Sequence, residues 1–450
     1  MTRTPRNRSF VQRSLFLAAG LALGQLCFAA DYIVEVEAGT NIASLASKYG
    51  FTVVKSYASA EQVSYRVTAV PPLTIQALQS LNREKGIEQV DSNTTIHSPE
   101  SSHPPVAGKL EPLGTLFATR AGTTFYGSHV LAAYVNQPGT GMIELAQAHV
   151  SFGAGSGIVA IIDTGVDTGH PALVDALIPG YDFTRDQPNT VSELHDLTPA
   201  AAAALNQSTV EILDTKKSVV ALSQSTVEIL DQSTVEILDA QGLPSAFGHG
   251  TMTAGLVHLV APNARIMPLK AFRSDGSASL YDIDRAIRYA TDHGANVINM
   301  SFSYTADSPV LKAAIDYATS HGVLAVASSG NDGKETAVYP ASYPYVIGVG
   351  STNYSDRRSP FSNHGKSART SAVGEALVTL YPGGNYAAVW GTSFSTALVS
   401  GAAALMRPLH PKLRYDSFCD ALDSGVRVDL DMGDARLDLS RSLTSLLRSR

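Results

Sequence analysis

The stretch Ile158-Val159-Ala160-Ile161-Ile162-Asp163-Thr164-Gly165 decides which class of fold this sequence predicts. Its first five residues form an uninterrupted apolar run, which is typical of a strand buried on both faces of a parallel sheet. The run ends in an aspartate, and α/β sheets place their functional groups at the carboxyl ends of their strands. Asp163 is therefore the first candidate site residue.

Strands and helices alternate after this run. The patterns predict strands over 265–272, 297–300, 323–328 and 346–350, and helices over 280–293 and 309–321. Alternation at this spacing indicates a parallel sheet with right-handed crossovers. The expected fold class is α/β, a parallel sheet flanked by helices, over a domain that spans 134–450.

A smaller unit at 30–97 precedes this domain. Its patterns predict strands over 32–36, 51–54, 63–67 and 87–90, and helices over 42–50 and 71–82. This order, β-α-β-β-α-β, is that of a small ferredoxin-like α+β domain. Residues 98–133 are rich in Ser, Pro, Gly and Thr, and we interpret them as an exposed linker and processing region.

The first 29 residues have the pattern of an export signal. Four arginines precede an apolar stretch from Leu15 to Leu23, and small residues follow at Ala29-Ala30. The stretch is shorter than the ~20 apolar residues of a membrane span. We therefore expect a signal peptide over 1–29, a secreted or periplasmic product and no membrane span in the mature form. Cleavage removes Cys27 and leaves Cys419 alone, so we expect no internal disulfide.

Three further blocks carry side chains with chemical potential. Phe247-Gly248-His249-Gly250 places a histidine between glycines, Ser328-Ser329-Gly330-Asn331 ends a predicted strand, and Gly391-Thr392-Ser393 leads into a helix of small residues. A serine at a helix start lies beside unpaired backbone N–H groups and the positive end of the helix dipole. Each block alone has an ordinary structural interpretation, since serine caps helices and asparagine favours turns.

Together, the blocks around Asp163, His249, Asn331 and Ser393 resemble the four signature blocks of subtilisin-type serine peptidases (subtilases). The resemblance runs from about Tyr134 to the end of the chain. It implies that Ser393 is the nucleophile, His249 the general base and Asp163 the group that orients His249. It also implies an oxyanion hole formed by Asn331 and the Ser393 N–H. The implied activity is that of a serine endopeptidase that cleaves polypeptides through an acyl-enzyme.

The resemblance extends to the substrate site and to the small unit. It implies that Ser301-Phe302-Ser303 is a strand that pairs with extended substrate, with Ser329 and Gly330 lining the site. Val338 stands where many relatives have glycine at the floor of the P1 pocket, so we expect small or medium P1 residues. The 30–97 unit resembles the family's inhibitory propeptide, which implies a self-processing zymogen with its own propeptide as intramolecular inhibitor.

The sequence also departs from the family pattern. The calcium loop that many subtilases insert is missing from 255–262, and Ala172 replaces the aspartate that often follows the His-Pro pair. We therefore expect no tight calcium site and no required cofactor. Met252 and Ser303 replace a usual histidine and glycine. Ala397 replaces a usual proline after the nucleophile, from which we expect a looser start of that helix.

Asp163 and His249 are separated by a long insert at about 186–244. It contains the identical octapeptide Gln-Ser-Thr-Val-Glu-Ile-Leu-Asp at 207–214, 224–231 and 232–239. Each copy fits both a helix capping box and a strand alternation, and the alanine run before the first copy favours helix. Two interpretations stay open: a tolerated surface insertion, and a lid or partner-docking element near the site.

Other functions are less consistent with the sequence. Asp163-Thr164-Gly165 and Asp423-Ser424-Gly425 match the triplets of aspartic peptidases, but that fold is nearly all β. A net charge of -7 without a long basic run argues against nucleic-acid binding. The remaining alternative is a catalytically silent, secreted binding protein on a subtilase fold. In either case we expect a monomer.

Overall fold

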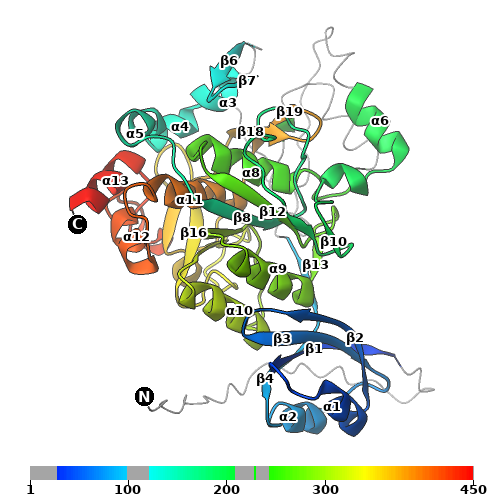
Figure 1. The fold of residues 1–450 in the computed structure, drawn as a ribbon. Coiled ribbons are helices and arrows are strands. Elements are labelled where there is room, and N and C mark those ends of the chain that lie inside the picture. Colours follow the sequence, from blue (N-terminus) through cyan, green and yellow to red (C-terminus); the bar gives the residue numbers. More distant parts are fainter. Residues whose placement is uncertain (1–27, 99–120, 208–227, 230–242, 449–450) are drawn as a thin grey trace.

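The computed structural model describes residues 28–98, 121–207, 228–229 and 243–448. The larger domain is built on a sheet with the strand order β10-β9-β12-β8-β14-β15-β16-β17 (Figure 1). Neighbouring strands from β9 to β17 run parallel, and β10 pairs antiparallel with β9. The strands are β8 (Ile158–Asp163), β9 (Tyr181–Asp182), β10 (Gln187–Pro188), β12 (Arg265–Lys270), β14 (Val297–Met300), β15 (Leu324–Ser328), β16 (Val346–Thr352) and β17 (Thr370–Val373).

Helices cover both faces of this sheet, so the predicted α/β architecture is confirmed. The helices α8 (His249–Val260) and α11 (Thr392–Met406) pack on one face, and α9 (Leu280–Asp292) and α10 (Pro309–Ser320) pack on the other. Successive residues of β8 serve both layers. Val159 and Ile161 join the core with α8 and α11, whereas Ala160 and Ile162 join the core with α9 and α10.

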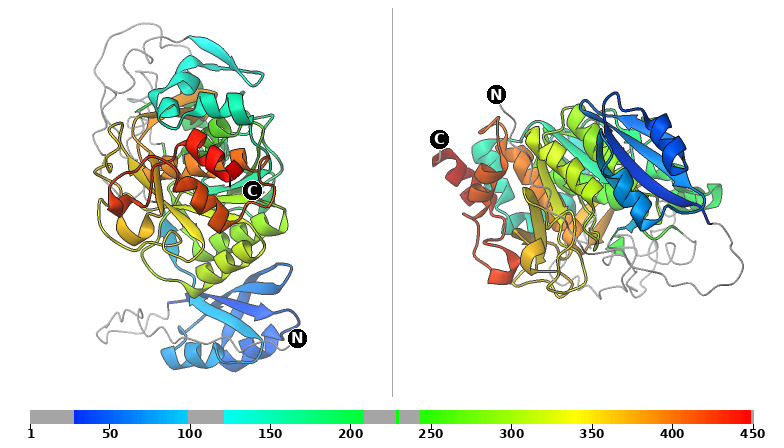
Figure 2. Two further views of the ribbon diagram at one scale, coloured as in Figure 1. Left: turned by 90° about the vertical axis from the view of Figure 1, so that its left-hand side faces the viewer. Right: turned by 90° about the horizontal axis from the view of Figure 1, so that it is seen from below.

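The N-terminal unit has the predicted β-α-β-β-α-β order. Its antiparallel sheet has the order β2-β3-β1-β4, and it has a hydrophobic core of its own. Figures 1 and 2 show the two helices on the outer face of this sheet, while the inner face rests on α9 and α10. The elements are β1 (Ala30–Glu37), α1 (Ile42–Tyr49), β2 (Phe51–Ala58), β3 (Gln62–Ala69), α2 (Ile75–Leu81) and β4 (Ile87–Ser92).

Two boundaries differ from the sequence prediction. The helix expected from Pro71 begins at Ile75, because the Thr74 hydroxyl accepts a hydrogen bond from the Ala77 N–H at 3.1 Å and caps the helix there. The end of the expected linker is folded into the larger domain. Residues 122–131 form the hairpin of β6 (Gly122–Phe125) and β7 (Ser128–Leu131), and Phe125 and Val130 are buried in the core around α8.

The remaining described elements complete the domain. The hairpin of β18 and β19 lies beside α8, and α12 and α13 pack together near α5. No helix in the described ranges is long and apolar enough to cross a membrane. The bounds are α3 (Ala132–Asn136), α4 (Pro138–Met142), α5 (Leu145–Phe152), β18 (Leu377–Tyr381), β19 (Asn385–Val389), α12 (Tyr415–Leu422) and α13 (Leu439–Arg448).

The predicted signal segment and most of the three repeats lie outside the described residues. The alanine run before the first repeat is helical, as α6 (Pro199–Gln207). Two residues of the second repeat form the short strand β11 (Glu228–Ile229), which pairs antiparallel with β19. For these two residues the preference for helix is wrong, and the strand alternation is the pattern that is realised.

Candidate active site

The four candidate catalytic residues lie at the ends of separate elements. Asp163 is the last residue of β8, His249 the first of α8 and Ser393 the second of α11, while Asn331 follows β15. All four are buried, with exposures of 3%, 1%, 0% and 8% in that order. Burial matters here because electrostatic interactions are much stronger away from bulk water.

The Asp163 carboxylate orients the His249 ring. His249 Nδ1 donates to Asp163 Oδ1 at 2.7 Å. The Thr164 N–H donates to the same oxygen at 2.7 Å, and the Thr253 hydroxyl donates to Oδ2 at 3.2 Å. With the proton on Nδ1, Nε2 is the basic nitrogen of the ring.

A glycine allows the histidine helix to begin against the aspartate turn. A Cβ atom at Gly250 would lie 1.9 Å from the Gly165 carbonyl oxygen, closer than any side chain permits. The Gly250 N–H is also bound to this turn, because it donates to the Thr164 hydroxyl at 3.0 Å. The segments that carry Asp163 and His249 are therefore in direct backbone contact.

Ser393 lies in the first turn of α11. Gly391 caps this helix with φ +151°, a conformation that favours glycine. The Ser393 hydroxyl donates to the Ser301 carbonyl at 3.2 Å, and the Ser301 hydroxyl donates to the Ser393 carbonyl at 3.0 Å. The ring of the next residue, Phe394, lies 5.7 Å from the His249 ring. The serine and the histidine are thus neighbours.

Asn331 contacts the same helix start through its side chain. Its Oδ1 accepts from the Thr392 N–H at 3.0 Å and from the Thr392 hydroxyl at 2.7 Å. These two bonds fix which end of the amide is the donor, since Nδ2 is the end turned away from Thr392. The residues after Asn331 are held by Asn363, whose Oδ1 accepts from the N–H groups of Asp332 and Lys334, both at 3.0 Å.

The comparisons with known proteins identify the family. The family model described as the subtilase family matches residues 155–423, more than half of the chain. The chain belongs to the subtilase family. Thermitase of Thermoactinomyces vulgaris is 30% identical to this subtilase over 281 residues, which cover 60% of this chain and 81% of thermitase.

Other matches are shorter or more distant. A thermophilic serine proteinase of Bacillus sp. (strain AK1) is 33% identical over 257 residues, or 57% of this chain and 53% of that protein. The chain therefore spans about half the length of this relative. The structure of fervidolysin from Fervidobacterium pennivorans, described as a keratinolytic enzyme related to subtilisin, superposes with a TM-score of 0.67 at 21% identity. The superposition covers 93% of this chain and 61% of fervidolysin, and this likeness supports the fold alone.

The expected substrate strand at 301–303 is not a strand. β14 ends at Met300, and Ser301 instead contacts Ser393 directly. A different edge carries an extended partner. β13 (Ser277–Ser279) pairs antiparallel with β5 (Thr95–His97), at the end of the N-terminal unit. The sequence prediction missed β13 because three residues are too few to show an alternation; its one signal was the preceding Asp-Gly turn pair.

The other proposed substrate residues lie close to these groups. Ser329 and Gly330 directly precede Asn331, and the Ser329 hydroxyl donates to the Asn363 carbonyl at 3.2 Å. Phe302 is buried, and its ring lies 5.1 Å from that of Phe272. Val338 is 1% exposed and packs in the core layer that contains α9 and α10. Its effect on P1 preference stays a prediction.

The two positions at which this chain departs from the calcium-binding pattern of many subtilases lie at one hollow. α8 runs unbroken from His249 to Val260, and its end together with Ala172 lines a hollow of about 270 Å³. The other groups there include the His258 imidazole, the Arg265 guanidinium and only one carboxylate, Asp175. Calcium requires six to eight oxygen ligands. The residues present do not fit that ion.

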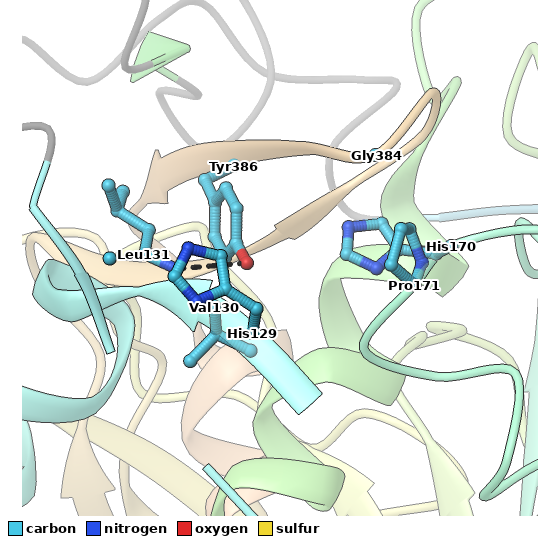
Figure 3. Close-up of a pocket in the computed structure, with 8 residues that line it drawn as sticks. His129, Val130, Leu131, His170, Pro171, Gly384 and Tyr386 are labelled. Carbon is cyan, nitrogen blue, oxygen red and sulfur yellow. Dashed lines mark hydrogen bonds between the residues drawn. The ribbon is translucent and has the colours of Figure 1, made fainter. Parts of the chain in front are cut away.

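A second hollow, of about 300 Å³, lies between β7 and the turn of the β18–β19 hairpin (Figure 3). The Tyr386 hydroxyl accepts from the Leu131 N–H at 3.1 Å beside it. His170 Nε2 donates to the Asn385 carbonyl at 3.1 Å, and Nδ1 accepts from the Ala172 N–H at 3.1 Å. Both nitrogens of His170 are thus engaged by backbone. No candidate catalytic residue lines this hollow.

Proposed function

We propose that this subtilase is a serine endopeptidase that hydrolyses polypeptides with Ser393, His249 and Asp163. The observation that carries the proposal is the buried 2.7 Å hydrogen bond from His249 Nδ1 to Asp163 Oδ1, beside a serine at a helix start. Ser393 Oγ attacks the substrate carbonyl carbon while His249 Nε2 takes its proton. Asp163 stabilises the imidazolium that forms without taking the proton itself.

The tetrahedral intermediate places a negative charge on the former carbonyl oxygen. Asn331 Nδ2 and the Ser393 N–H donate to that oxygen, and the positive end of the α11 dipole supports them. His249 then protonates the leaving amine, so the C–N bond breaks and an acyl-enzyme remains. Water, deprotonated by His249, attacks the ester and releases the acid product and free Ser393.

We also propose that the chain is made as an exported, self-processing zymogen. The N-terminal unit packs on α9 and α10, and β5 lies as an extended strand against β13, as a peptide ligand adds to a strand edge. In this proposal the unit is the intramolecular inhibitor, and the mature enzyme works as a secreted or periplasmic monomer. It requires no tightly bound calcium, since the expected ligand positions do not fit that ion.

The test compares the full chain with Ser393→Ala. Wild type should react with an active-site serine probe such as a fluorophosphonate, hydrolyse casein and shed an N-terminal fragment; the variant should do none of these and stay full length. A matured wild type that neither labels nor hydrolyses would support the alternative, a silent binding protein on the same fold. Equal fragment sizes for both chains would contradict self-processing.

A further inference from the structure

A buried carboxylate that has no part in the proposed reaction lies behind the histidine helix. Glu193 begins a short 3-10 helix, Glu193–Asp196, at the front of the insert, and it is 0% exposed. Its Oε1 accepts from the Thr251 N–H at 2.8 Å and from the Thr251 hydroxyl at 2.7 Å. Its Oε2 accepts from the Gly248 N–H. All three donors belong to the start of α8.

These contacts replace a helix cap that the local sequence lacks. The first N–H groups of a helix have no partner within the helix, and the residue before it usually supplies a side-chain acceptor. Here that residue is Gly248, which has no side chain. The acceptor comes instead from Glu193, more than 50 residues earlier in the chain. The position of His249, the first residue of α8, therefore depends on Glu193.

The same segment also holds the aspartate side of the site. The Val166 N–H donates to the Val191 carbonyl at 2.9 Å. Asp196 Oδ2 accepts from Lys270 Nζ at 2.7 Å, and this buried ammonium also donates to the Thr164 carbonyl. Lys270 stands opposite Asp163 in the β12–β8 register. Residues 191–196 thus join the turn after Asp163 to the start of α8.

Charge adds a second effect to this mechanical one. The charged groups that act on Glu193 are Asp163 from β8, Lys270 from β12 and, through Lys270, Asp196 from its own turn. Burial raises the pKa of Glu193 to about 8, while Thr251 and Lys270 favour the ionised form. The carboxyl is therefore neutral below about pH 8 and ionised above it, where it adds negative potential behind the Asp163–His249 pair. Negative potential favours the imidazolium that forms in the transition state.

We propose that Glu193 is a positioning residue for His249, which caps the histidine helix from the insert. The proposal rests on the proposed peptidase function. It predicts that Glu193→Gln, which keeps the shape but loses one acceptor for the helix start, lowers kcat on a short peptide by about 10- to 100-fold, as small misplacements of catalytic groups do. KM should change by less than about twofold, because Glu193 does not line the proposed substrate site.

The pH profile separates this role from a merely structural one. Glu193 becomes ionised only as the pH rises through about 8, and it then adds negative potential beside His249. The ratio of the wild-type kcat to that of Glu193→Gln should therefore grow as the pH rises through 8. Glu193→Asp keeps an ionisable carboxyl but is shorter; it should lose kcat while keeping a rise of kcat with pH. Gln137→Ala is the matched control. Gln137 is 1% exposed and makes three hydrogen bonds, to Tyr134 and Val378, away from the triad. It should lower stability with kcat and the pH profile unchanged.

A measurement independent of turnover completes the test. In the full chain with Ser393→Ala, NMR follows the titration of the His249 ring with Glu193 intact and with Glu193→Gln. We expect the His249 ring signals to show a second step near pH 8, where Glu193 ionises, and we expect the double variant to lack this step. Equal titrations in the two chains overturn the proposal even if wild type proves inactive. Loss of the step in Gln137→Ala overturns it too. Wild type without activity but with the expected difference refutes only the peptidase function.

Discussion

The buried contact between the N-terminal unit and α9 predicts that binding of the two parts depends on pH. Arg288 on α9 lies between two carboxylates: its Nη2 is 2.7 Å from Glu35 Oε1 on β1, and its Nε is 2.7 Å from Asp284 Oδ1. None of the three side chains is more than 1% exposed. One guanidinium therefore forms ion pairs with two buried carboxylates. Burial, with the negative charge of Asp284, raises the pKa of Glu35 to about 8 from its ordinary 4.5, although Arg288 opposes the shift.

The sign of the effect follows from this shift. Once the unit dissociates, Glu35 is in water and regains its ordinary pKa, so binding takes up a proton at any pH between the two values. The binding free energy that the proton supplies is fully present below about 4.5 and is lost as the pH rises through about 8. The limit is one proton, or ~1.4 kcal/mol and tenfold in affinity per pH unit. From pH 6 to pH 8 the affinity should fall by up to about 100-fold.

Glu35→Gln imitates the protonated carboxyl and should remove this dependence. The N-terminal unit, which has a core of its own, would be added as a separate chain to the mature enzyme, and inhibition of peptide hydrolysis would be measured from pH 6 to pH 8. The variant should bind nearly as tightly at pH 8 as at pH 6. Calorimetry in buffers of different ionisation enthalpy should show proton uptake for wild type only. Glu37→Gln, an exposed residue of the same strand, is the control. Equal pH slopes for wild type and Glu35→Gln would refute the reasoning.

Three other outcomes are expected. Burial lowers the pKa of His258 to about 4, so the contribution of the neutral ring to the unfolding free energy is present above about pH 6.5 and is lost as the pH falls through 4. His258→Gln should reduce the change of the urea unfolding free energy over this pH range by up to about 3 kcal/mol. An unfolding free energy that depends on pH as strongly as in wild type would contradict the assignment. Exhaustive chelation with EDTA should leave the Tm of the mature enzyme unchanged, whereas a sharp drop would reveal a calcium site. Val338→Gly should shift cleavage of a peptide library towards Phe and Tyr at P1, and a wild type that already prefers them would contradict the shallow pocket.

Local patterns predicted those parts of the fold that depend on local physics. The strand expected over 297–300 is β14, and the helices expected from Leu280 and Pro309 begin there. Apolar runs and helical periodicity report which faces are buried, and burial on two sides defines β8 and its neighbours. Residues 301–303 form no strand with another part of the described chain, and Ser301 contacts Ser393; their pairing with substrate stays a prediction.

The supports of the site were not predictable in this way. Glu193 lies in an insert for which we left two interpretations open, a tolerated surface insertion and a lid or partner-docking element, and it is fully buried against α8. Asn363 holds the segment after Asn331 from more than 30 residues downstream. Neither residue has a local pattern, because a hydrogen bond between distant segments leaves no periodicity in the sequence. The motif blocks contain the proposed reacting groups, and the residues that hold them come from elsewhere in the chain.

The start of α11 shows how such supports bear on a conclusion drawn from a motif alone. We expected a looser helix start because Ala397 replaces the family's proline. Proline in the first turns of a helix lacks the N–H that bonds to the carbonyl four residues earlier, which here is that of Ser393. Alanine restores that donor and has the highest helix propensity. The Thr396 hydroxyl also donates to the Thr392 carbonyl at 2.7 Å, and the Ser395 hydroxyl to the Ala372 carbonyl at 3.0 Å. These contacts weigh against a loose start of the helix that carries Ser393, and the effect of Ala397 stays a prediction.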